Sequence, residues 1–488
     1  MDGYSGVRWS AISKYGAQGT QFIISMVMAR LLAPEYFGLL GMAVVITGFV
    51  SIFRNLGFSQ AIVQRKEVSE RLLSTLFWVN LGMCLLIAMI VLAISPLAAW
   101  IYDDARVTPI VAALSLSFVF AGFTMIPGAL LTRQMDFKRL AIREIGGIVV
   151  SGVTAISLAY LGWGVWALVI SSLANSAAQM VLINIAKPFR PQMVYDSQGL
   201  SECLRFGLNL TGFGVFNYFS RNADNLIIGV FLGPIALGYY SLAYKLMLMP
   251  RDSVTGVVTR VLFPKFSRLQ DDDETLTNLY LRACGAIAFI TFPMMAGLAV
   301  LAEPFVRTVL GEKWLPAIPL IWLLAPVGAI QSIGSTSGQI FLAKGRSGWM
   351  FRLGILNGSV RILSFLLGIP WGVVGVASSY TIISFVLIPS NFWFMCKLVD
   401  GLTIKSILKT LQPYTTASLL MGSTVALGLR LVPANDFPAV ALSTSIAIGV
   451  VSYALIVIKT RPPAIDDFWR MLPSGVARLP ILRMLRVS

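Results

Sequence analysis

The stretch Leu31–Ala43, LLAPEYFGLLGMA, returns in altered form 200 residues further along as Phe231–Ala243, FLGPIALGYYSLA. In each copy an apolar run reaches a proline, a short turn follows, and a second apolar run begins. Proline has no N–H with which to continue a helix, and glycine relieves a tight reversal, so each copy predicts the tip of a helical hairpin. Two such tips divide the chain into two similar helical bundles. Four positions carry the same residue in both copies: Leu32 and Leu232, Pro34 and Pro234, Gly38 and Gly238, Ala43 and Ala243.

The composition is that of a membrane protein. Of the 488 residues, 57% are hydrophobic and 12% are charged, whereas a soluble chain carries roughly 25% charged residues. Histidine is absent, which removes the commonest general base and metal ligand. The four cysteines are isolated and lack metal-binding spacing. We therefore expect no metal and no cofactor, and the absence of an A-x-A cleavage pattern predicts no signal peptide.

A spanning helix needs about 20 mostly apolar residues. The chain contains fourteen such stretches, which predict an all-α protein that crosses the membrane repeatedly. Twelve spans remain the alternative if the last two helices are peripheral. The fourteen stretches are 10–32, 38–62, 77–101, 108–131, 144–162, 164–186, 206–232, 238–262, 283–302, 317–343, 353–370, 373–396, 410–431 and 438–458.

These spans group into two six-helix lobes and a further helix pair. A second repeat supports the grouping, because Trp163-Gly164-Val165 and Trp371-Gly372-Val373 each lie at a short turn between paired spans. The shared order of both repeats predicts lobes related by a pseudo-two-fold axis along the membrane normal. The predicted segments are an N-terminal lobe 1–187, a cytoplasmic linker 188–205, a C-terminal lobe 206–398, a helix pair 399–458 and a basic amphipathic cytoplasmic tail 459–488.

The distribution of basic residues predicts the orientation. If the N-terminus is cytoplasmic, the inside segments hold 27 of the 38 Lys and Arg residues and the outside loops hold four. Inside loops of membrane proteins carry such an excess, so both termini are predicted to be cytoplasmic. This accounts for most of the net charge of +16 without nucleic acid as a partner. The basic tail is expected to lie on anionic membrane lipids.

The remaining basic residues fall inside apparent spans. Arg30 and Arg260 lie near span ends, from which long side chains can reach the interface. Each deeper cation would cost about 2.5–3.5 kcal/mol against lipid, so we expect those cations to face inward. Helical spacing agrees with this expectation, because polar or small residues lie on the same helix faces as these cations. On the tenth span a polar stripe consists of Ser332, Ser335, Thr336 and Gln339. On the eleventh span the stripe around Arg361 consists of Gly354, Asn357, Ser364 and Gly368. The deep set is Arg54, Arg221, Lys245, Arg251 and Arg361.

These stripes predict a water-filled cavity shared by the two lobes. The acids available against five deep cations are Asp224 and Asp252, and such a positive excess favours an anionic ligand. Arginine suits phosphate through its bidentate fork. We therefore predict that the five deep cations bind the pyrophosphate of a lipid-linked substrate. Two alternatives stay open: the charges can stabilise helix packing through pairs such as Arg221–Asp224, and Asp224 can relay a proton.

Several stretches resemble one family of transporters. They are ARLLAPEYFGLLGMA (Ala29–Ala43), LLTRQMDFKRLA (Leu130–Ala141), GWGVWALV (Gly162–Val169), FPKFSRLQDD (Phe263–Asp272) and IFLAKGR (Ile340–Arg346). On these stretches the chain resembles the Wzx-type oligosaccharide flippases, in the branch of colanic-acid and other exopolysaccharide exporters. These belong to the superfamily of multidrug, oligosaccharidyl-lipid and polysaccharide (MOP) transporters.

The resemblance implies a V-shaped bundle of two lobes in the bacterial inner membrane that works by alternating access. It implies a substrate of undecaprenyl-pyrophosphate-linked oligosaccharide, moved from the cytoplasmic to the periplasmic leaflet during exopolysaccharide, O-antigen or capsule assembly. Polysaccharide polymerase and export machinery are implied partners. Two other functions are alternatives. A drug or cation antiporter of the same superfamily would show the opposite charge balance, and a membrane enzyme of polysaccharide assembly would need large outer loops or paired carboxylates.

Overall fold

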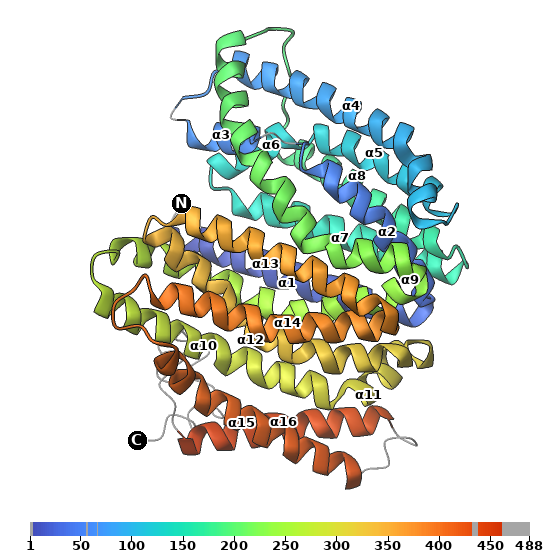
Figure 1. The fold of residues 1–488 in the computed structure, drawn as a ribbon. Coiled ribbons are helices and arrows are strands. Elements are labelled where there is room, and N and C mark those ends of the chain that lie inside the picture. The colour runs from blue at the N-terminus through green and yellow to red at the C-terminus, as the bar shows by residue number, and fades with distance from the viewer. Residues whose placement is uncertain (1–2, 55–56, 66, 432–437, 461–488) are drawn as a thin grey trace. The chain divides into compact units, whose positions relative to one another are not determined.

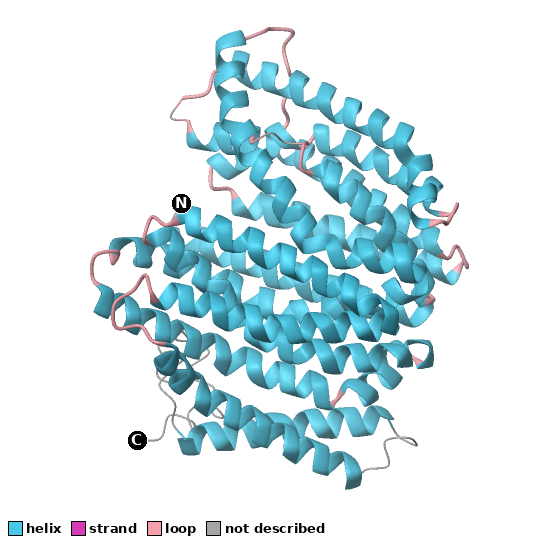
Figure 2. Ribbon diagram, in the orientation of Figure 1, coloured by secondary structure: helices cyan, strands magenta, loops and turns pink. Residues whose placement is uncertain are grey.

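The computed structural model describes residues 3–54, 57–65, 67–431 and 438–460. Every regular element among these residues is a helix (Figures 1 and 2). The predicted all-α class is therefore confirmed. Residues 461–488, which form most of the predicted basic tail, lie outside the described residues.

The helices fall into two compact units, Met1–Ser241 and Leu242–Ser488, and the predicted lobe boundaries stay a prediction. The first unit contains α1 (Gly3–Leu31), α2 (Pro34–Ser51), α3 (Phe58–Gln64), α4 (Glu70–Tyr102), α5 (Val107–Gly122), α6 (Met125–Arg133), α7 (Phe137–Tyr160) and α8 (Val165–Ala186). The long helix α9 (Ser197–Arg268) begins in the first unit and ends in the second. The second unit contains α10 (Asp273–Val300), α11 (Ala302–Phe305), η1 (Val306–Leu310), η2 (Glu312–Ala317), α12 (Ile318–Ala343), α13 (Ser347–Gly368), η3 (Ile369–Trp371), α14 (Gly372–Cys396), α15 (Ile404–Leu431) and α16 (Pro438–Thr460).

Two of the predicted spans are interrupted. The span 38–62 is divided, because α2 ends at Ser51 and α3 begins only after Gly57, whose φ of 70° lies in the left-handed region. The span 108–131 bends by 46° between α5 and α6. A third break agrees with the predicted second tip, which separates the spans 206–232 and 238–262. Within α9, Gly233 has φ 80° and ψ −179°, so it separates the helical segments on either side of this tip.

Nine helical stretches among the described residues are long and apolar enough to cross a membrane, or ten if the bent pair α5–α6 forms one span. Two of the nine are far longer than the thickness of a bilayer requires: Asn217–Val254 has 38 residues and Ser347–Cys396 has 50. The first contains parts of the predicted spans 206–232 and 238–262, and the second contains the predicted spans 353–370 and 373–396 in full. The protein is therefore a multi-pass membrane protein, and the number fourteen stays a prediction.

The two repeated tips contact each other reciprocally. A Cβ atom built on Gly38 would lie 1.7 Å from the carbonyl oxygen of Pro234, and one built on Gly238 would lie 2.0 Å from that of Pro34. Real Cβ atoms essentially never approach a neighbour within 3.0 Å, so this crossing admits only glycine at both positions. Pro-x-x-x-Gly places the two residues one helical turn apart, on the same face. The sequence repeat that predicts two hairpins therefore encodes the contact between them.

An ion-pair cluster fixes the first tip to the turn between α4 and α5. The Arg106 guanidinium lies 2.7 Å from a Glu35 carboxylate oxygen and 2.8 Å from an Asp104 carboxylate oxygen. The hydrogen bonds from Arg106 hold the pKa of the Asp104 carboxyl below its ordinary value of 3.8. Those two acids in turn raise the pKa of Arg106. These ion pairs therefore link α2 to the turn between α4 and α5 at this end of the first unit.

The second sequence repeat also has a structural counterpart. Gly164 and Gly372 both have positive φ, at 55° and 67°, and both occupy the position just before or at the start of a helix. The preceding Trp163 and Trp371 are exposed. Exposed tryptophans at helix ends are typical of the membrane–water interface. The two Trp-Gly-Val turns are thus alike in backbone geometry as well as in sequence.

In each unit a basic side chain after or at the end of one helix donates a hydrogen bond to a backbone carbonyl oxygen of another segment. In the first unit, Arg133 at the end of α6 donates to the carbonyl oxygen of Ile62 in α3 at 3.1 Å. In the second unit, Lys344 after α12 donates to the carbonyl oxygen of Gln270 after α9, and it also pairs with Asp273. Both helix ends would otherwise leave carbonyl groups without partners. Two of the stretches that carry the family resemblance, FPKFSRLQDD and IFLAKGR, therefore meet at this contact.

The acidic run at residues 271–274 lies at the start of α10. Asp272 caps α10 by accepting from the backbone N–H of Thr275 at 3.0 Å. Asp273 pairs with Lys344 and accepts from the backbone N–H of Asp400 at 2.7 Å. Among the described residues no group of three or more His, Cys, Asp or Glu residues could hold a metal ion.

The linker between the predicted lobes is fixed along the first turns of α4. Ser74 and Thr75 accept from the backbone N–H groups of Gln192 and Asp196, at 3.1 Å and 2.9 Å. The Trp78 indole donates to the carbonyl oxygen of Gln192 at 3.1 Å. This part of the predicted linker is therefore ordered, and it forms a strap that is hydrogen-bonded to α4 at Gln192 and Asp196.

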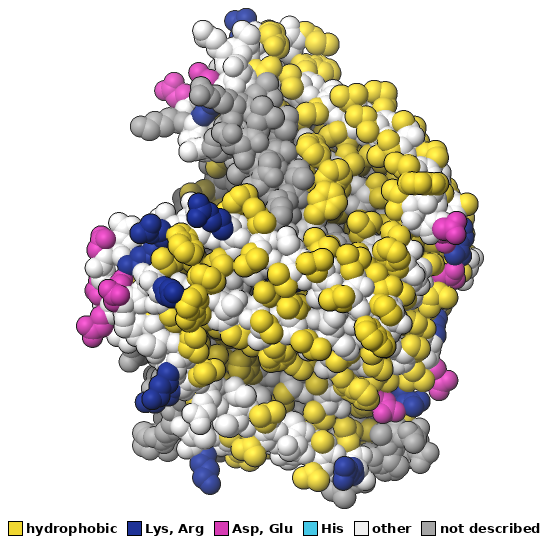
Figure 3. Space-filling model, viewed as in Figure 1, with side chains coloured by type: hydrophobic (Ala, Val, Ile, Leu, Met, Phe, Trp, Pro, Cys, Tyr) yellow, Lys and Arg dark blue, Asp and Glu magenta, His cyan; other side chains and the backbone are white. Residues whose placement is uncertain are grey.

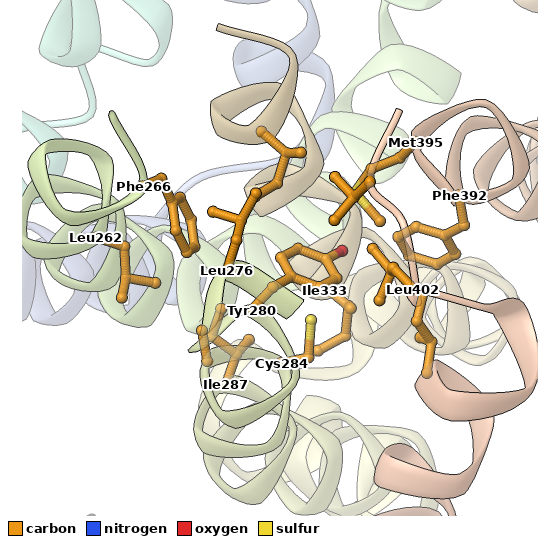
Figure 4. Packing of buried hydrophobic residues seen from close by; sticks show 14 of the residues in the cluster. Leu262, Phe266, Leu276, Tyr280, Cys284, Ile287, Ile333, Phe392, Met395 and Leu402 are labelled. Carbon is orange, nitrogen blue, oxygen red and sulfur yellow. The ribbon is translucent and has the colours of Figure 1, made fainter. Parts of the chain in front are cut away.

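A buried hydrophobic cluster holds the second unit together and positions its polar residues. Tyr280 and Cys284 of α10 are fully buried at its centre, where α9, α12, α14 and α15 converge. Figure 4 shows side chains from α9, α10, α12 and α14 pointing toward one another there. The residues labelled in that view are Leu262, Phe266, Leu276, Tyr280, Cys284, Ile287, Ile333, Phe392, Met395 and Leu402.

The last helix pair packs onto α10. The Tyr453 hydroxyl of α16 donates to the carbonyl oxygen of Phe289 at 2.8 Å. Gly285 leaves room for Tyr414 of α15, whose hydroxyl would lie 3.2 Å from a Cβ atom there. The pair α15–α16 is therefore attached to the second unit by specific contacts.

Candidate functional site: arginines inside the helical units

Arg54 follows the end of α2, where the predicted second span breaks. The side chain is half-buried, and its Nε atom is buried without a hydrogen-bond partner among the described residues. A buried donor without a partner costs about 1–3 kcal/mol, so this position is better suited to a bound anion or water than to packing.

Arg221 and Asp224 lie one turn apart on α9 but differ in environment. Arg221 is exposed, whereas Asp224 is 3% exposed. The Tyr240 hydroxyl donates to one Asp224 carboxylate oxygen at 3.0 Å, and the backbone N–H of Asn225 donates to the other at 2.8 Å. The structure thus gives Asp224 a buried tyrosine partner that the sequence argument did not anticipate. The predicted roles of Arg221 and Asp224 both stay predictions.

Arg251 is held in a polar chain that crosses three helices of the second unit. Its guanidinium donates to Asp252 and to the side-chain oxygen of Gln331 in α12, each at 3.1 Å. The Gln331 amide in turn donates to the Tyr380 hydroxyl of α14 at 2.5 Å. Gln331 and Tyr380 are buried, while the Arg251 side chain is 20% exposed. This series of hydrogen bonds therefore orients the Arg251 guanidinium, and part of the side chain stays accessible.

Lys245 and Arg361 complete the predicted set within the second unit. Lys245 of α9 is exposed. Arg361 of α13 is half-buried, and its Nε atom, like that of Arg54, is buried without a hydrogen-bond partner among the described residues. Of the five predicted residues, Arg54 and Arg221 lie in the first unit and the other three in the second. The shared cavity stays a prediction.

Part of the predicted polar stripes serves packing instead. Ser332 and Thr336 of α12 are fully buried, and the Ser332 hydroxyl lies 2.8 Å from that of Thr291 in α10. On α13, Asn357 donates to Asn391 of α14 at 2.9 Å. These contacts fit the interhelical interpretation for single residues. The stripes on α12 and α13 therefore contain helix-to-helix hydrogen bonds beside the basic residues.

Arg143 has the same character as Arg54 and Arg361, although it lies just before the predicted span 144–162. It lies two turns inside α7, and its Nη1 atom would be 3.7 Å from a Cβ atom on Gly128 of α6. Its Nε atom is buried without a hydrogen-bond partner among the described residues. The missed signal is Asp136, which accepts from the backbone N–H of Arg139 at 3.1 Å and so starts α7 ahead of the predicted residue 144.

Basic groups of this kind are suited to an anion, and their role in binding one stays a prediction. Within the part of the chain that the structure describes, three half-buried arginines have an Nε donor without a hydrogen-bond partner, and Arg251 is oriented by its hydrogen bond to Gln331. Guanidinium groups cannot deprotonate at neutral pH, so they provide fixed charge for a phosphate or carboxylate. The four cysteines are free thiols, three of them buried, and belong to the packed interior.

Comparison with known proteins supports a common family. Residues 27–319 match the model of a family described as "Polysaccharide biosynthesis protein". The chain is 28% identical over 431 residues to the lipopolysaccharide biosynthesis protein WzxC of Escherichia coli (strain K12), with 88% of each chain covered. It is 25% identical over 476 residues to the succinoglycan biosynthesis transport protein ExoT of Rhizobium meliloti (strain 1021), with 97% of this chain and 96% of the relative covered.

A solved structure has the same fold. The lipid II flippase MurJ in an inward closed conformation superposes with a TM-score of 0.76 at 16% sequence identity. The match covers 93% of this chain and 98% of that chain. The likeness therefore extends through both units.

Proposed function

This chain belongs to the family of polysaccharide biosynthesis proteins, and from that premise we propose that it is a flippase for lipid-linked oligosaccharide. Its cargo is a repeat unit joined through pyrophosphate to an isoprenoid lipid such as undecaprenol. The isoprenoid stays in the bilayer while the sugar and the pyrophosphate cross the membrane from the cytoplasmic to the periplasmic leaflet. The transport names of ExoT and MurJ support a carrier rather than an enzyme.

The observation that carries the proposal is a set of buried arginine Nε donors inside apolar helical units. Arg54, Arg143 and Arg361 each hold a buried Nε donor without a partner among the described residues. Leaving such a donor without a partner costs free energy in the empty protein, and an anionic oxygen would recover it. A carrier of organic cations would gain nothing from these groups. The charge balance therefore favours an anionic cargo over the drug antiporter.

Alternating access follows if the anion binds the two conformations unequally. A ligand shifts such an equilibrium only by its difference in affinity for the two states. Fixed positive charges on Arg and Lys side chains provide that difference when one state brings more of them within reach of the pyrophosphate than the other does. We propose that Arg54, Arg221, Lys245, Arg251 and Arg361 do this. The Asp224–Tyr240 pair positions α9, and a proton relay through Asp224 is the alternative role.

Lipid-linked repeat units provide the test. Cells that lack the protein should stop making polymer and accumulate lipid-linked oligosaccharide on the cytoplasmic face of the inner membrane. Variants R54A and R361A should reproduce that accumulation while reaching the membrane at normal abundance. Arg307→Gln is the matched control, because this half-buried arginine pairs with Glu303 in the short helical segments α11 and η1. Normal polymer from both site variants would refute the assignment of these residues, and unchanged lipid-linked intermediates in the deletion would refute the function.

A further inference from the structure

A patch of exposed aromatic and basic side chains lies where α13 begins and α14 ends. Trp349 and Trp393 are each 44% exposed, and the rings of Trp349 and Phe394 lie 5.9 Å apart. The Trp393 and Phe394 rings lie 4.9 Å apart. The Lys397 ammonium lies 3.6 Å above the Trp393 ring, within the range of a cation–π interaction. The aromatic rings therefore form one continuous surface from α13 to α14.

Three cations border this surface. Arg346 precedes the first turn of α13, Arg352 follows Trp349 by three residues, and Lys397 ends α14, and all three are exposed. The nearby acid Asp400 is exposed as well, and its backbone N–H is bound to Asp273. The balance of charge is positive. Figure 3 shows Lys and Arg side chains beside hydrophobic ones at the left of the view, over these ends of α13 and α14.

Exposed aliphatic side chains continue directly from the patch along both helices. On α13, Leu356, Leu363 and Leu367 are 54%, 59% and 71% exposed, and they lie 4, 11 and 15 residues beyond Arg352. At 100° per residue these spacings fall within about 60° of the Arg352 direction, so all four side chains share one face.

The same geometry repeats on α14 in the reverse direction. Val386 and Ile382 are 58% and 67% exposed, and they precede Lys397 by 11 and 15 residues. They too lie within about 60° of the direction of that lysine. Each helix therefore presents a cation at one end of a face and bare aliphatic side chains along the rest of it.

We infer that this surface is a binding site for an anionic phospholipid, with the headgroup phosphate at Arg346, Arg352 and Lys397 and the acyl chains along the leucine face of α13 and the aliphatic face of α14. A phosphate headgroup matches the three cations, and basic clusters next to spanning helices attract anionic lipids. Tryptophan rings at the junction fit the boundary between headgroups and acyl chains, where one edge is wet and the other is apolar. The site lies apart from the proposed cargo residues and does not depend on flippase activity.

Lipid retention by the purified full-length protein tests the inference. Native mass spectrometry after equilibration with equal amounts of phosphatidylglycerol and phosphatidylcholine should show preferential retention of the anionic lipid. Each basic residue near an anionic surface contributes roughly a 5-fold gain in partitioning, so R346Q/R352Q/K397Q should lower the preference by up to about 100-fold. Arg430→Gln, which removes an exposed cation from the end of α15, should leave it unchanged. Equal preference in the triple variant and the wild type would overturn the inference, as would displacement of phosphatidylglycerol from this patch by an equimolar isoprenoid pyrophosphate.

Tryptophan fluorescence gives a second reading that does not require removal of charge. Brominated phosphatidylglycerol should quench the wild-type protein more strongly than brominated phosphatidylcholine at the same mole fraction. The W349F/W393F variant should lose that difference, because the two reporter rings at the patch are then absent. An equal excess of quenching in this variant would place the anionic lipid elsewhere and refute the site.

Discussion

The Gly38→Ala substitution tests the reciprocal crossing of the two tips. The added methyl group would lie 1.7 Å from the carbonyl oxygen of Pro234, so the two backbones must separate by about 1.3 Å to reach even the 3.0 Å limit of real contacts. The obstructing atom belongs to the backbone and cannot rotate away. Forcing extra volume into a packed site costs typically 1–3 kcal/mol, and we expect a value near the upper end of that range.

The matched control is Gly82→Ala in the middle of α4, where an added Cβ atom meets nothing within 4 Å. In a helix interior, alanine is favoured over glycine by roughly 0.5–1 kcal/mol, so this control should be neutral or stabilising. The two substitutions therefore differ in sign although they make the same chemical change. The contrast isolates the crossing from helix propensity.

The double variant G38A/G238A gives a sharper result. Both glycines serve one crossing, so the separation forced by the first methyl group already relieves part of the clash of the second. The two losses should then add up to more than the loss in the double variant, with a coupling of about 0.5–3 kcal/mol. Independent sites would be additive.

Thermal unfolding in detergent provides the assay. A thiol-reactive dye can report exposure of the buried thiols of Cys84, Cys203 and Cys284. Unfolding of a membrane protein in detergent is commonly irreversible, so apparent Tm values should be compared at one scan rate. A G38A protein as stable as G82A, or strictly additive losses in the double variant, would refute the proposed crossing.

Three further changes test other parts of the structure. Gln331→Leu should reduce export more than Tyr380→Phe does, because only the first change removes the side-chain oxygen that accepts from Arg251. Loss of a hydrogen bond to a charged group costs about 1.5–3 kcal/mol. Polymer yield at equal protein abundance measures the difference between the two variants. Asp104→Asn should lower the apparent Tm at pH 7, by the equivalent of about 1 kcal/mol or less because the pair is partly exposed. Since the folded-state pKa of Asp104 is depressed, that contribution is present above pH 3.8 and is lost as the pH falls through the lower folded value, so the variant and the wild type should converge in acid. Thr75→Val should release the strap at Asp196 and increase cleavage of the linker by added protease, whereas Thr416→Val on the exposed face of α15 should not.

The sequence predicted the helical architecture because its signals are local. Runs of apolar residues marked each of the nine described helical stretches that are long and apolar enough to cross a membrane. Proline and glycine marked both tips and both Trp-Gly-Val turns. The predicted helix boundaries were wrong where a capping residue or a residue in the left-handed region determines them. Asp136 starts α7 earlier than the apolar run suggests, which moves Arg143 into the unit, and Gly57 follows the interruption of the second predicted span.

The candidate site was less accessible to sequence reasoning. Helical spacing showed that polar residues share faces with Arg251 and Arg361, but it could not separate a side chain that contacts another helix from one that stays available. Ser332 and Arg251 lie on faces of similar polarity, yet the first hydrogen-bonds Thr291 in the core and the second keeps part of its guanidinium accessible. That distinction depends on partners far apart in the chain, such as Gln331 and Tyr380, which no local pattern reveals.

The paired contact at the tips has the form of a homodimer interface. Where residue i of one copy meets residue j of the other and the converse also holds, the surface is self-complementary, as in an isologous dimer of identical subunits. Such a surface needs only one half-length gene to arise, and fusion of two copies then frees each to diverge. Most of the hairpin has diverged, since Tyr36 corresponds to Ala236 and Phe37 to Leu237. The proline and the glycine are retained in both halves because a change on either side would disturb the same junction.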